Sequence, residues 1–287
     1  MATATFDLDS VEREIAGTQF AGCLIHLATV VSTNDLALQA AQAGALHGVW
    51  IADQQTAGRG RGGHTWHSEP GTPQAAAGLY MTALVSPSIP MQTTLRLSFR
   101  VAVAVQSAIV SVAGFKRPDE IDIRWPNDLL LRGRDGRVRK CGGILIETAA
   151  KPAPSSGPSM LHHAVIGIGV NCNHTSFPPE LDLIATSLRR ELPDPTQLIS
   201  RERLATAILI ALDTQLRALT HASQQPSSSS HPDLAQHSTW ITGKRVRIDE
   251  GGGYTGITAG LDANGFLLVA GDDGVLHTVL SGGLREP

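Results

Sequence analysis

The chain has 287 residues, a formal net charge of −3, 42% hydrophobic residues and 17% charged residues. This length allows one large domain or a domain with a smaller companion, and the composition is that of a folded protein rather than a disordered or fibrous one. The negative net charge argues against nucleic-acid binding as the main function. The sequence also contains no run of eighteen uninterrupted apolar residues, which a membrane span would need.

Strand and helix patterns follow one another through the first 220 residues. An apolar strand is predicted at 23–30, and the small polar side chains at 32–35 precede a helix that Gly44 ends. Long apolar stretches of helical type cover 95–112 and 204–219. Short apolar runs predict further strands at 49–52, 79–85, 121–125, 129–131, 143–147 and 164–170.

The character of the sequence changes after a serine-rich segment. Four serines at 227–230 lie in a segment that we interpret as a linker at 223–237. Beyond it, short β-type runs separated by Gly, Asp and Asn predict a small all-β barrel at 238–287. The main domain is then expected at 23–222, after an N-terminal extension at 1–22 that has room for one helix.

A loop rich in glycine and arginine is predicted between two strands. It reads Gly58-Arg59-Gly60-Arg61-Gly62-Gly63-His64-Thr65-Trp66. Glycine lets the backbone approach a ligand closely, and guanidinium groups donate paired hydrogen bonds to phosphate or carboxylate oxygens. We interpret the segment as a phosphate-handling loop. An unstructured or nucleic-acid-binding Arg/Gly segment is the alternative, and the shortness of the loop and its place between strands argue against it.

Three further clusters place polar groups or glycines at strand ends. Arg124-Trp125-Pro126-Asn127-Asp128 combines an aromatic ring, an amide and a carboxylate, although by itself it also fits an ordinary tight turn. Lys140-Cys141-Gly142-Gly143 either projects an ammonium group into a pocket floored by bare backbone or carries a solvated lysine after a hairpin. Gly167-Ile168-Gly169-Val170-Asn171 lacks the third glycine and the following helix of a dinucleotide-binding loop. The remaining interpretation is that its glycines let the backbone lie close to a ligand.

Together with Ser32-Thr33-Asn34, these clusters occur in the order and spacing found in bacterial biotin–protein ligases, which the chain resembles over 24–270. The resemblance implies an α+β fold, with a class II aminoacyl-tRNA synthetase-like catalytic domain built on a mixed β-sheet and followed by an SH3-like β-barrel. It also implies a two-step reaction. The biotin carboxylate attacks the α-phosphate of ATP, giving biotinyl-5′-adenylate, and a lysine of an acceptor protein then attacks this intermediate.

The resemblance also implies partners and cofactors. The acceptor would be the biotin carboxyl carrier domain of a carboxylase such as acetyl-CoA carboxylase, with ATP and Mg²⁺ as cofactors and biotin as substrate. A homodimer is compatible with the sequence but not indicated by it. We expect no DNA partner, because only about 22 residues precede the first strand, too few for a helix-turn-helix module.

Attack of a carboxylate on a phosphate brings two anions together, so positive donors must offset their repulsion. Lys140, Arg59 and Arg61 are suited to this, and Asp128 is expected to orient or deprotonate the incoming lysine or to act through Mg²⁺. By the resemblance, the residues that line the biotin pocket are Ser32, Thr33, Asn34, Gln55, Arg59, Gly60, Arg61, Lys140, Gly143 and Gly167. Those that meet ATP or the adenylate are Trp66, Asn127, Lys140 and Asn171.

The chain departs from the family pattern at two positions. His64 stands where many relatives have a further arginine, and Arg124 stands where a lysine is usual. Because that arginine helps order the loop over the adenylate, a histidine is expected to loosen retention of the intermediate or to make it dependent on pH.

Two other functions remain compatible with the sequence. Enzymes that transfer lipoate or octanoate share the fold and also attach an acyl group to a carrier lysine, although the glycine–arginine loop and the C-terminal barrel favour biotin. A non-catalytic biotin-binding protein is the second, and the presence of Lys140 and Arg59 argues against it.

The cysteines and the N-terminal residues give information about the cellular compartment of the protein. Cys23, Cys141 and Cys172 are an odd number at wide spacing, which suggests neither a disulfide framework nor a metal pair. Asp7 and Asp9 stand where a secretory signal needs basic residues and an apolar run. We therefore expect a cytoplasmic protein without a structural metal and without a membrane partner.

Overall fold

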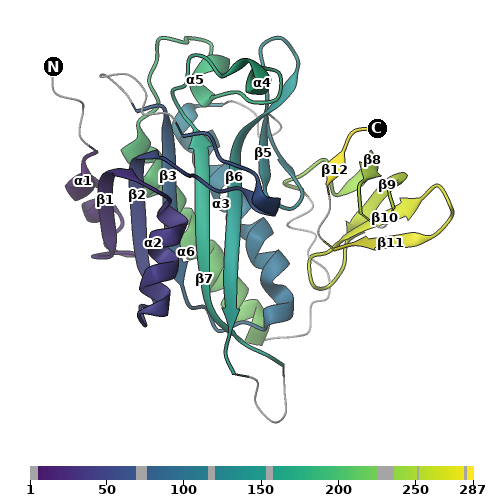
Figure 1. Ribbon diagram of the computed structural model, residues 1–287, viewed down its shortest axis with the longest axis horizontal. Coiled ribbons are helices and arrows are strands. Elements are labelled where there is room, and N and C mark those ends of the chain that lie inside the picture. The colour runs from purple at the N-terminus through teal and green to yellow at the C-terminus, as the bar shows by residue number, and fades with distance from the viewer. Residues whose placement is uncertain are drawn as a thin grey trace.

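The computed structural model describes residues 6–68, 76–115, 120–152, 158–224, 236–250, 252–280 and 283–287, which form two β-sheets with flanking helices (Figure 1). The larger sheet has seven strands in the order β1-β2-β3-β7-β6-β5-β4. These strands are β1 Leu24–Val30, β2 Gly48–Gln55, β3 Gly78–Val85, β4 Ile121–Arg124, β5 Asp128–Arg132, β6 Val138–Ala150 and β7 Leu161–Asn171.

This sheet is mixed, because β1 runs parallel to β2 while each other neighbouring pair is antiparallel. The strands predicted from apolar runs are all present, with β6 and β7 longer than expected. The long β6·β7 ladder pairs Gly143 with Gly169 and Leu145 with Gly167, so glycines of both strands meet at the middle of the sheet.

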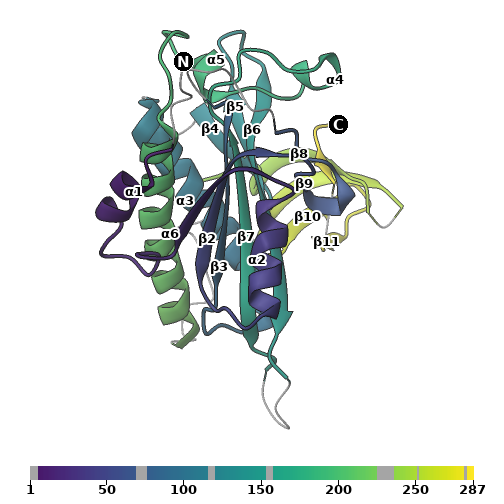
Figure 2. The same cartoon turned by 60° about the vertical axis from the view of Figure 1, so that its left-hand side comes forward.

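Helices cover both faces of the large sheet (Figure 2). The helix α2, Thr33–Gln42, lies on one face against β2, β3 and β7. The two long helices α3, Thr94–Ala113, and α6, Arg201–Gln224, pack together on the other face. The shorter helices are α1 Leu8–Glu14, α4 Pro179–Asp182 and α5 Leu188–Glu191, with 3₁₀ turns η1 Arg61–Gly63 and η2 Met91–Thr93.

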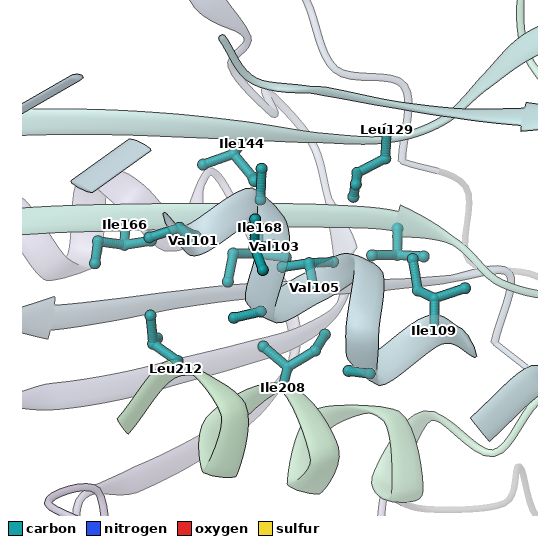
Figure 3. Close-up of a cluster of buried hydrophobic side chains, with 14 of the residues drawn as sticks. Val101, Val103, Val105, Ile109, Leu129, Ile144, Ile166, Ile168, Ile208 and Leu212 are labelled. Carbon is teal, nitrogen blue, oxygen red and sulfur yellow. The ribbon is translucent and has the colours of Figure 1, made fainter. Parts of the chain in front are cut away.

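The main core lies between the sheet and the α3·α6 layer (Figure 3). Val101 of α3 lies beside Ile166 of β7, and Ile208 of α6 belongs to the same buried cluster. Complete burial of such a side chain stabilises the fold by about 1.5–3 kcal/mol. Residues 91–113 are long and apolar enough to cross a membrane, but this segment is largely buried in the core.

The smaller sheet is antiparallel and C-terminal, in the order β11-β10-β9-β8-β12. Its strands are β8 Thr242–Ile248, β9 Tyr254–Leu261, β10 Leu267–Gly271, β11 Leu276–Val279 and β12 Leu284–Arg285, the last of which the sequence did not indicate. It contacts the main domain beside β4, where the indole N–H of Trp125 donates to Gly265 O at 3.1 Å and the Ser238 hydroxyl donates to Ile123 O at 2.5 Å. The predicted α+β class with a small C-terminal β-unit is confirmed.

The predicted domain boundaries remain predictions. Helix α6 continues to Gln224, two residues into the expected linker, and residues 225–235 lie outside the described part of the chain. The sequence also suggests an extension of the glycine–arginine loop at 68–77 and a Pro/Ser/Gly-rich insertion at 151–160, of which residues 69–75 and 153–157 lie outside the described part of the chain. Within the N-terminal extension, the described helix α1 is only seven residues long.

Candidate active site

A cavity enclosing about 450 Å³ lies on the α2 side of the large sheet, between the start of α2, the loop after β2, and strands β3, β7 and β6. All of the predicted site residues except Asp128 and Asn171 line it. A second cavity of about 580 Å³ adjoins it and shares Arg61 and Asn127, so the two form one continuous cleft.

One end of the cleft consists of neutral hydrogen-bonding groups. The Thr33 amide and hydroxyl donate to Gln55 Oε1 at 2.9 and 3.1 Å. The fully buried Thr82 hydroxyl donates to Asn34 Oδ1 at 2.6 Å and lies 2.8 Å from the Thr33 hydroxyl. Ser32 stands at the N-cap of α2, yet its hydroxyl makes no capping hydrogen bond. This end therefore suits a neutral ligand group with several donors and acceptors.

The floor of the cleft is bare backbone at three glycines. A Cβ at Gly167 would overlap Oδ1 of Asn34 and lie 2.9 Å from its Cγ. A Cβ at Gly169 would lie 2.6 Å from Cε2 of Trp66, and one at Gly143 would lie 3.0 Å from Cζ3 of the same ring. Glycine is required at these positions because the ring and the amide pack directly on the sheet.

Trp66 forms a wall of the cleft over Gly143 and Gly169. Its backbone N–H donates to Gly58 O at 2.8 Å, which closes the loop on itself. The indole N–H is buried and makes no hydrogen bond to any described residue. Within the loop, Gly62 has a φ of 66° and Gly63 a φ of 81°, conformations that favour glycine.

The other end of the cleft is charged. Lys140 Nζ lies 2.5 Å from Asp128 Oδ1 and 5.5 Å from the centre of the Trp66 ring. Asp128 Oδ2 lies 2.6 Å from the guanidinium of Arg124. Burial alone would raise the pKa of Asp128, but Lys140 and Arg124 outweigh that effect and hold it below its usual range. Asp128 is thus an anion between two cations, which suits orientation of Lys140 better than proton abstraction.

Arg61 is the cation of the cleft without a fixed partner. Its guanidinium makes no hydrogen bond or ion pair in the described part of the chain. Burial lowers the pKa of Arg61, and the more distant charges of Asp128 and Glu250 offset this only in part. A partly desolvated guanidinium that is not held by a carboxylate favours an incoming anion.

A β-bulge directs Lys140 into the cleft. Leu129 pairs with Gly142 and Leu130 with Lys140, which leaves Cys141 as an extra residue in β6. Lys140 and Gly143 are three residues apart and would point to opposite faces of a regular strand, whereas the bulge brings both to the cleft.

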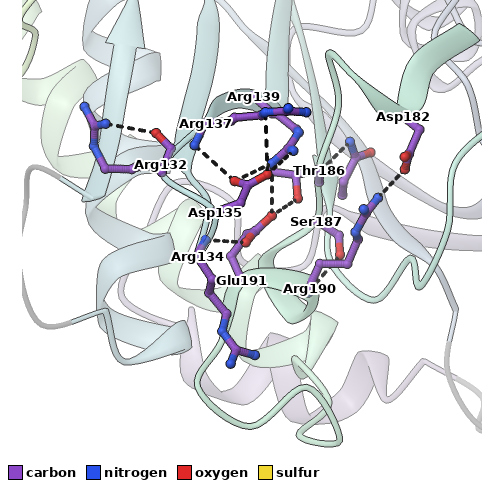
Figure 4. Close-up of polar contacts among 12 residues, drawn as sticks. Arg132, Arg134, Asp135, Arg137, Arg139, Asp182, Thr186, Ser187, Arg190 and Glu191 are labelled. Carbon is purple, nitrogen blue, oxygen red and sulfur yellow. Dashed lines mark hydrogen bonds and ion pairs between the residues drawn. The ribbon is translucent and has the colours of Figure 1, made fainter.

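Neighbouring contacts hold this part of β6 in place (Figure 4). The Lys140 N–H donates to Ile184 O at 2.9 Å, and the Thr186 N–H donates to Lys140 O at 2.9 Å. On the other face, the buried Arg139 pairs with Asp135 at 2.5 Å, and Glu191 accepts from the Thr186 hydroxyl at 2.5 Å.

The structure does not bring every predicted residue to the cleft. Asn171 is buried and its amide donates to Thr186 O at 3.0 Å, while Asp128 reaches the cleft only through its contact with Lys140. Conversely, the sequence interpretation assigned no role to Thr82, Gly169 or Glu147. The alternation of a β-strand could have identified Gly169, because it lies on the same face as Gly167.

Arg59 lines the cleft but is already bound by acidic residues. Its guanidinium donates to both carboxylate oxygens of Glu147 at 3.0 and 2.8 Å and lies 2.8 Å from Asp35 Oδ1. The hydrogen bonds to Glu147 raise the pKa of Arg59. Glu147 Oε2 also accepts from the Asn34 amide at 2.9 Å.

The cleft thus combines a neutral hydrogen-bonding end, a glycine floor and a lysine-and-arginine end on one face of a mixed sheet. The family model described as the biotin/lipoate A/B protein ligase family matches residues 27–171, and that of the biotin protein ligase C terminal domain matches residues 241–282. The chain therefore belongs to the biotin/lipoate protein ligase family.

Individual relatives agree with this assignment. The bifunctional ligase/repressor BirA of Bacillus spizizenii is 33% identical over 255 residues, which cover 88% of this chain and 70% of that protein. A biotin–[acetyl-CoA-carboxylase] ligase of Mycobacterium tuberculosis is 33% identical over 256 residues, covering 88% and 84%. The structure of the Aquifex aeolicus biotin protein ligase in complex with biotin and ATP has the same fold, with a TM-score of 0.68, 22% identity and coverage of 93% and 100%.

Proposed function

We propose that the chain activates biotin with ATP and transfers it to a lysine of a biotin carboxyl carrier domain. The observation that carries this proposal is a single cleft with a neutral polar end and a cationic end, in a member of the biotin/lipoate protein ligase family. The names of the relatives, which include a biotin–[acetyl-CoA-carboxylase] ligase, support a carboxylase as the source of the acceptor.

In the proposed mechanism, the neutral ring of biotin lies at the end formed by Ser32, Thr33 and Gln55, where hydrogen bonds rather than charges recognise it. Its carboxylate then lies toward Lys140 and Arg61. These cations bring the carboxylate and the α-phosphate of ATP together and stabilise the charge that develops as pyrophosphate leaves.

The second step is attack of the acceptor lysine on the acyl carbon of the adenylate. The neutral amine attacks, the C–N bond forms, the bond from that carbon to the phosphate oxygen breaks, AMP leaves, and the proton lost by the amine passes to solvent water. Asp128 contributes by orienting Lys140, because both of its carboxylate oxygens are engaged by cations. Trp66 and Asn127 lie where the nucleotide would bind beside Lys140.

We propose that Mg²⁺ binds as a complex with the phosphates of ATP and is therefore part of the substrate. The described residues contain no group of three metal-binding side chains, and the carboxylates of Asp128, Glu147 and Asp35 are all paired with cations. This donor set does not fit an ion held by the protein.

The choice of biotin over lipoate is tested by supplying each labelled acid with ATP and a carrier domain. We expect label from biotin, and not from lipoate, to become acid-precipitable on the carrier. Transfer of lipoate with no transfer of biotin would refute the proposal.

The remaining predictions concern partners and location. Free Cys141 and Cys172, both buried, support a reducing compartment such as the cytoplasm, and the net charge of −3 supports the absence of a DNA partner. Whether the chain pairs with a second copy is a question for sedimentation of the purified protein.

His64 is exposed, and its backbone is engaged in the loop: its O accepts from the Gly60 N–H at 2.6 Å and its N–H donates to Arg61 O at 3.4 Å. We propose that this histidine shortens retention of the adenylate. The substitution His64→Arg should then slow release of the adenylate between pH 6 and 8, and equal release from both proteins across that range would contradict the idea.

A further inference from the structure

We propose that a residue of the C-terminal unit, Trp240, is a positioning residue for Lys140. It acts through two residues at the ends of the β4–β5 turn, because its ring holds Arg124 and Arg124 holds one oxygen of Asp128. The other oxygen of that carboxylate holds the lysine. The effect on catalysis rests on the proposed function, whereas the effect on the carboxylate does not.

The first contact is between a buried aromatic ring and two cations. Trp240 immediately precedes the start of the C-terminal sheet and is 5% exposed. The guanidinium carbon of Arg124 lies 5.8 Å from the centre of its ring, and Lys244 Nζ lies 4.7 Å from it. The face of an indole attracts a cation within about 6 Å, most strongly where water is excluded. The ring therefore restrains the guanidinium of Arg124.

The second contact is the ion pair of Arg124 with Asp128 across the β4–β5 turn. The two residues are paired directly in the antiparallel β4·β5 ladder, and the guanidinium lies 2.6 Å from Asp128 Oδ2. Lys140 Nζ lies 2.5 Å from the other oxygen, Oδ1. The carboxylate side chain is mostly buried, so water and salt screen these ion pairs less than they screen surface pairs. A displaced Arg124 would therefore displace the carboxylate that holds Lys140.

The C-terminal unit also fixes the backbone on both sides of Arg124. The Ser238 hydroxyl donates to Ile123 O at 2.5 Å, and the indole N–H of Trp125 donates to Gly265 O at 3.1 Å. The backbone that carries Arg124 is thus attached to the C-terminal unit. The contact with the aromatic ring then orients a side chain whose backbone is already in place.

Arginine is suited to position 124, where the family usually has lysine. A planar guanidinium can lie against an aromatic face while the N–H groups at its edge donate to a carboxylate. A lysine ammonium is a point charge without such a plane. Arg124 therefore connects Trp240 with Asp128 in a way that lysine would reproduce only in part.

Biotin-dependent exchange of pyrophosphate into ATP tests the proposal. We expect Arg124→Gln to lower kcat about tenfold and Trp240→Leu about threefold, with the KM for biotin changed less than about twofold because the neutral end of the cleft is untouched. Arg124→Lys, which keeps the charge beside Asp128, should recover most of the lost rate. The matched control is Lys244→Gln, which removes the other cation from the same ring. Lys244 is paired with Glu286 instead, so this variant should have wild-type kinetics.

A double variant identifies the route of the effect. If Trp240 acts through Arg124, the double variant Arg124→Gln, Trp240→Leu should be as slow as Arg124→Gln alone. Effects that multiply would overturn the proposal. A raised KM for ATP in Arg124→Gln, together with wild-type kinetics in Trp240→Leu, would also overturn it, because Arg124 would then contact the nucleotide itself.

The burial of Trp240 requires a second variant at this position, since loss of the ring can also lower stability. Trp240→Phe keeps a smaller ring and should lose less kcat than Trp240→Leu. If Trp240→Leu does not fold, Trp240→Phe takes its place, and a wild-type kcat in that variant would overturn the proposal.

The ionisation of Asp128 gives a measurement that needs no activity. Burial raises the pKa of Asp128, but Lys140 and Arg124 outweigh this effect and hold it low, and Arg61 is a further cation near it. Carbon NMR of the side-chain carboxyl should therefore show a higher pKa in Arg124→Gln and a smaller rise in Trp240→Leu. An unchanged pKa in both variants would overturn the proposal. If the wild type shows no exchange with biotin, the proposed function fails, and this titration still decides whether Trp240 acts on Asp128.

Discussion

Adding one methyl group at Gly167 should disrupt the polar end of the cleft. In Gly167→Ala the new Cβ overlaps Oδ1 of Asn34, a buried side chain that cannot move without leaving its partners. Those partners are the Thr82 hydroxyl at 2.6 Å and the Glu147 carboxylate at 2.9 Å. Loss of a neutral hydrogen bond costs about 1 kcal/mol and loss of one to a charged group about 2 kcal/mol.

The expected destabilisation of Gly167→Ala is therefore about 3 kcal/mol, which corresponds to a melting temperature roughly 6–12 °C lower. Biotin affinity should fall by up to about 100-fold, since each 1.4 kcal/mol changes a binding constant tenfold. Thermal unfolding and titration calorimetry with biotin measure the two effects. The control is Gly17→Ala, where a Cβ meets nothing within 4 Å. Wild-type melting and wild-type affinity in Gly167→Ala would refute the reasoning.

Three further predictions follow from the charged end and the cysteines. Lys140→Ala should lose adenylate formation by several orders of magnitude with the fold intact, as measured by pyrophosphate release, because the ammonium acts mainly in the transition state. The lowered pKa of Asp128 contributes stability that is present above its unfolded pKa and is lost as pH falls through its folded pKa, so Asp128→Asn should lower melting at pH 7 more than at pH 3. Burial raises the pKa of Cys141 and Cys172 to about 12, so iodoacetamide at pH 8 should label only Cys23 in the native protein, and labelling of the buried thiols would contradict the structure.

Much of the fold could be read from the sequence, because its strands and long helices are continuous apolar runs. Residues 95–112 predict a buried helix, and α3 occupies 94–113. The loop at 58–66 was recognisable because repeated glycine and arginine have few structural uses other than close approach to an anion. The two-residue strand β12 carries too little pattern to be predicted.

The direction of Lys140 could not be read from the sequence. A regular strand would turn it away from the face of Gly143, and only the bulge at Cys141 turns it into the cleft. A bulge depends on the register of β5 against β6, and a single strand sequence does not contain that information. The residue was therefore identified by resemblance, while its geometry required the structure.

Thr82 and Asn171 are two further residues whose positions relative to the cleft could not be predicted from the sequence. Thr82 was missed, and Asn171 was predicted to face a ligand but is covered. Strand β3 is apolar on both faces, so one threonine in it did not stand out, although its hydroxyl organises Asn34. Asn171 lies on the same side of β7 as Gly169, yet the segment that contains Thr186 covers it and accepts its amide hydrogen bond. Contacts between residues far apart in the chain decide both cases.

The central claim is that this cleft makes an adenylate from biotin, and exchange of labelled pyrophosphate into ATP in the absence of any acceptor tests it most directly. The wild type should show exchange that depends on biotin, and Lys140→Ala should show almost none. Exchange that requires lipoate instead of biotin, or no exchange with either acid, would contradict the account.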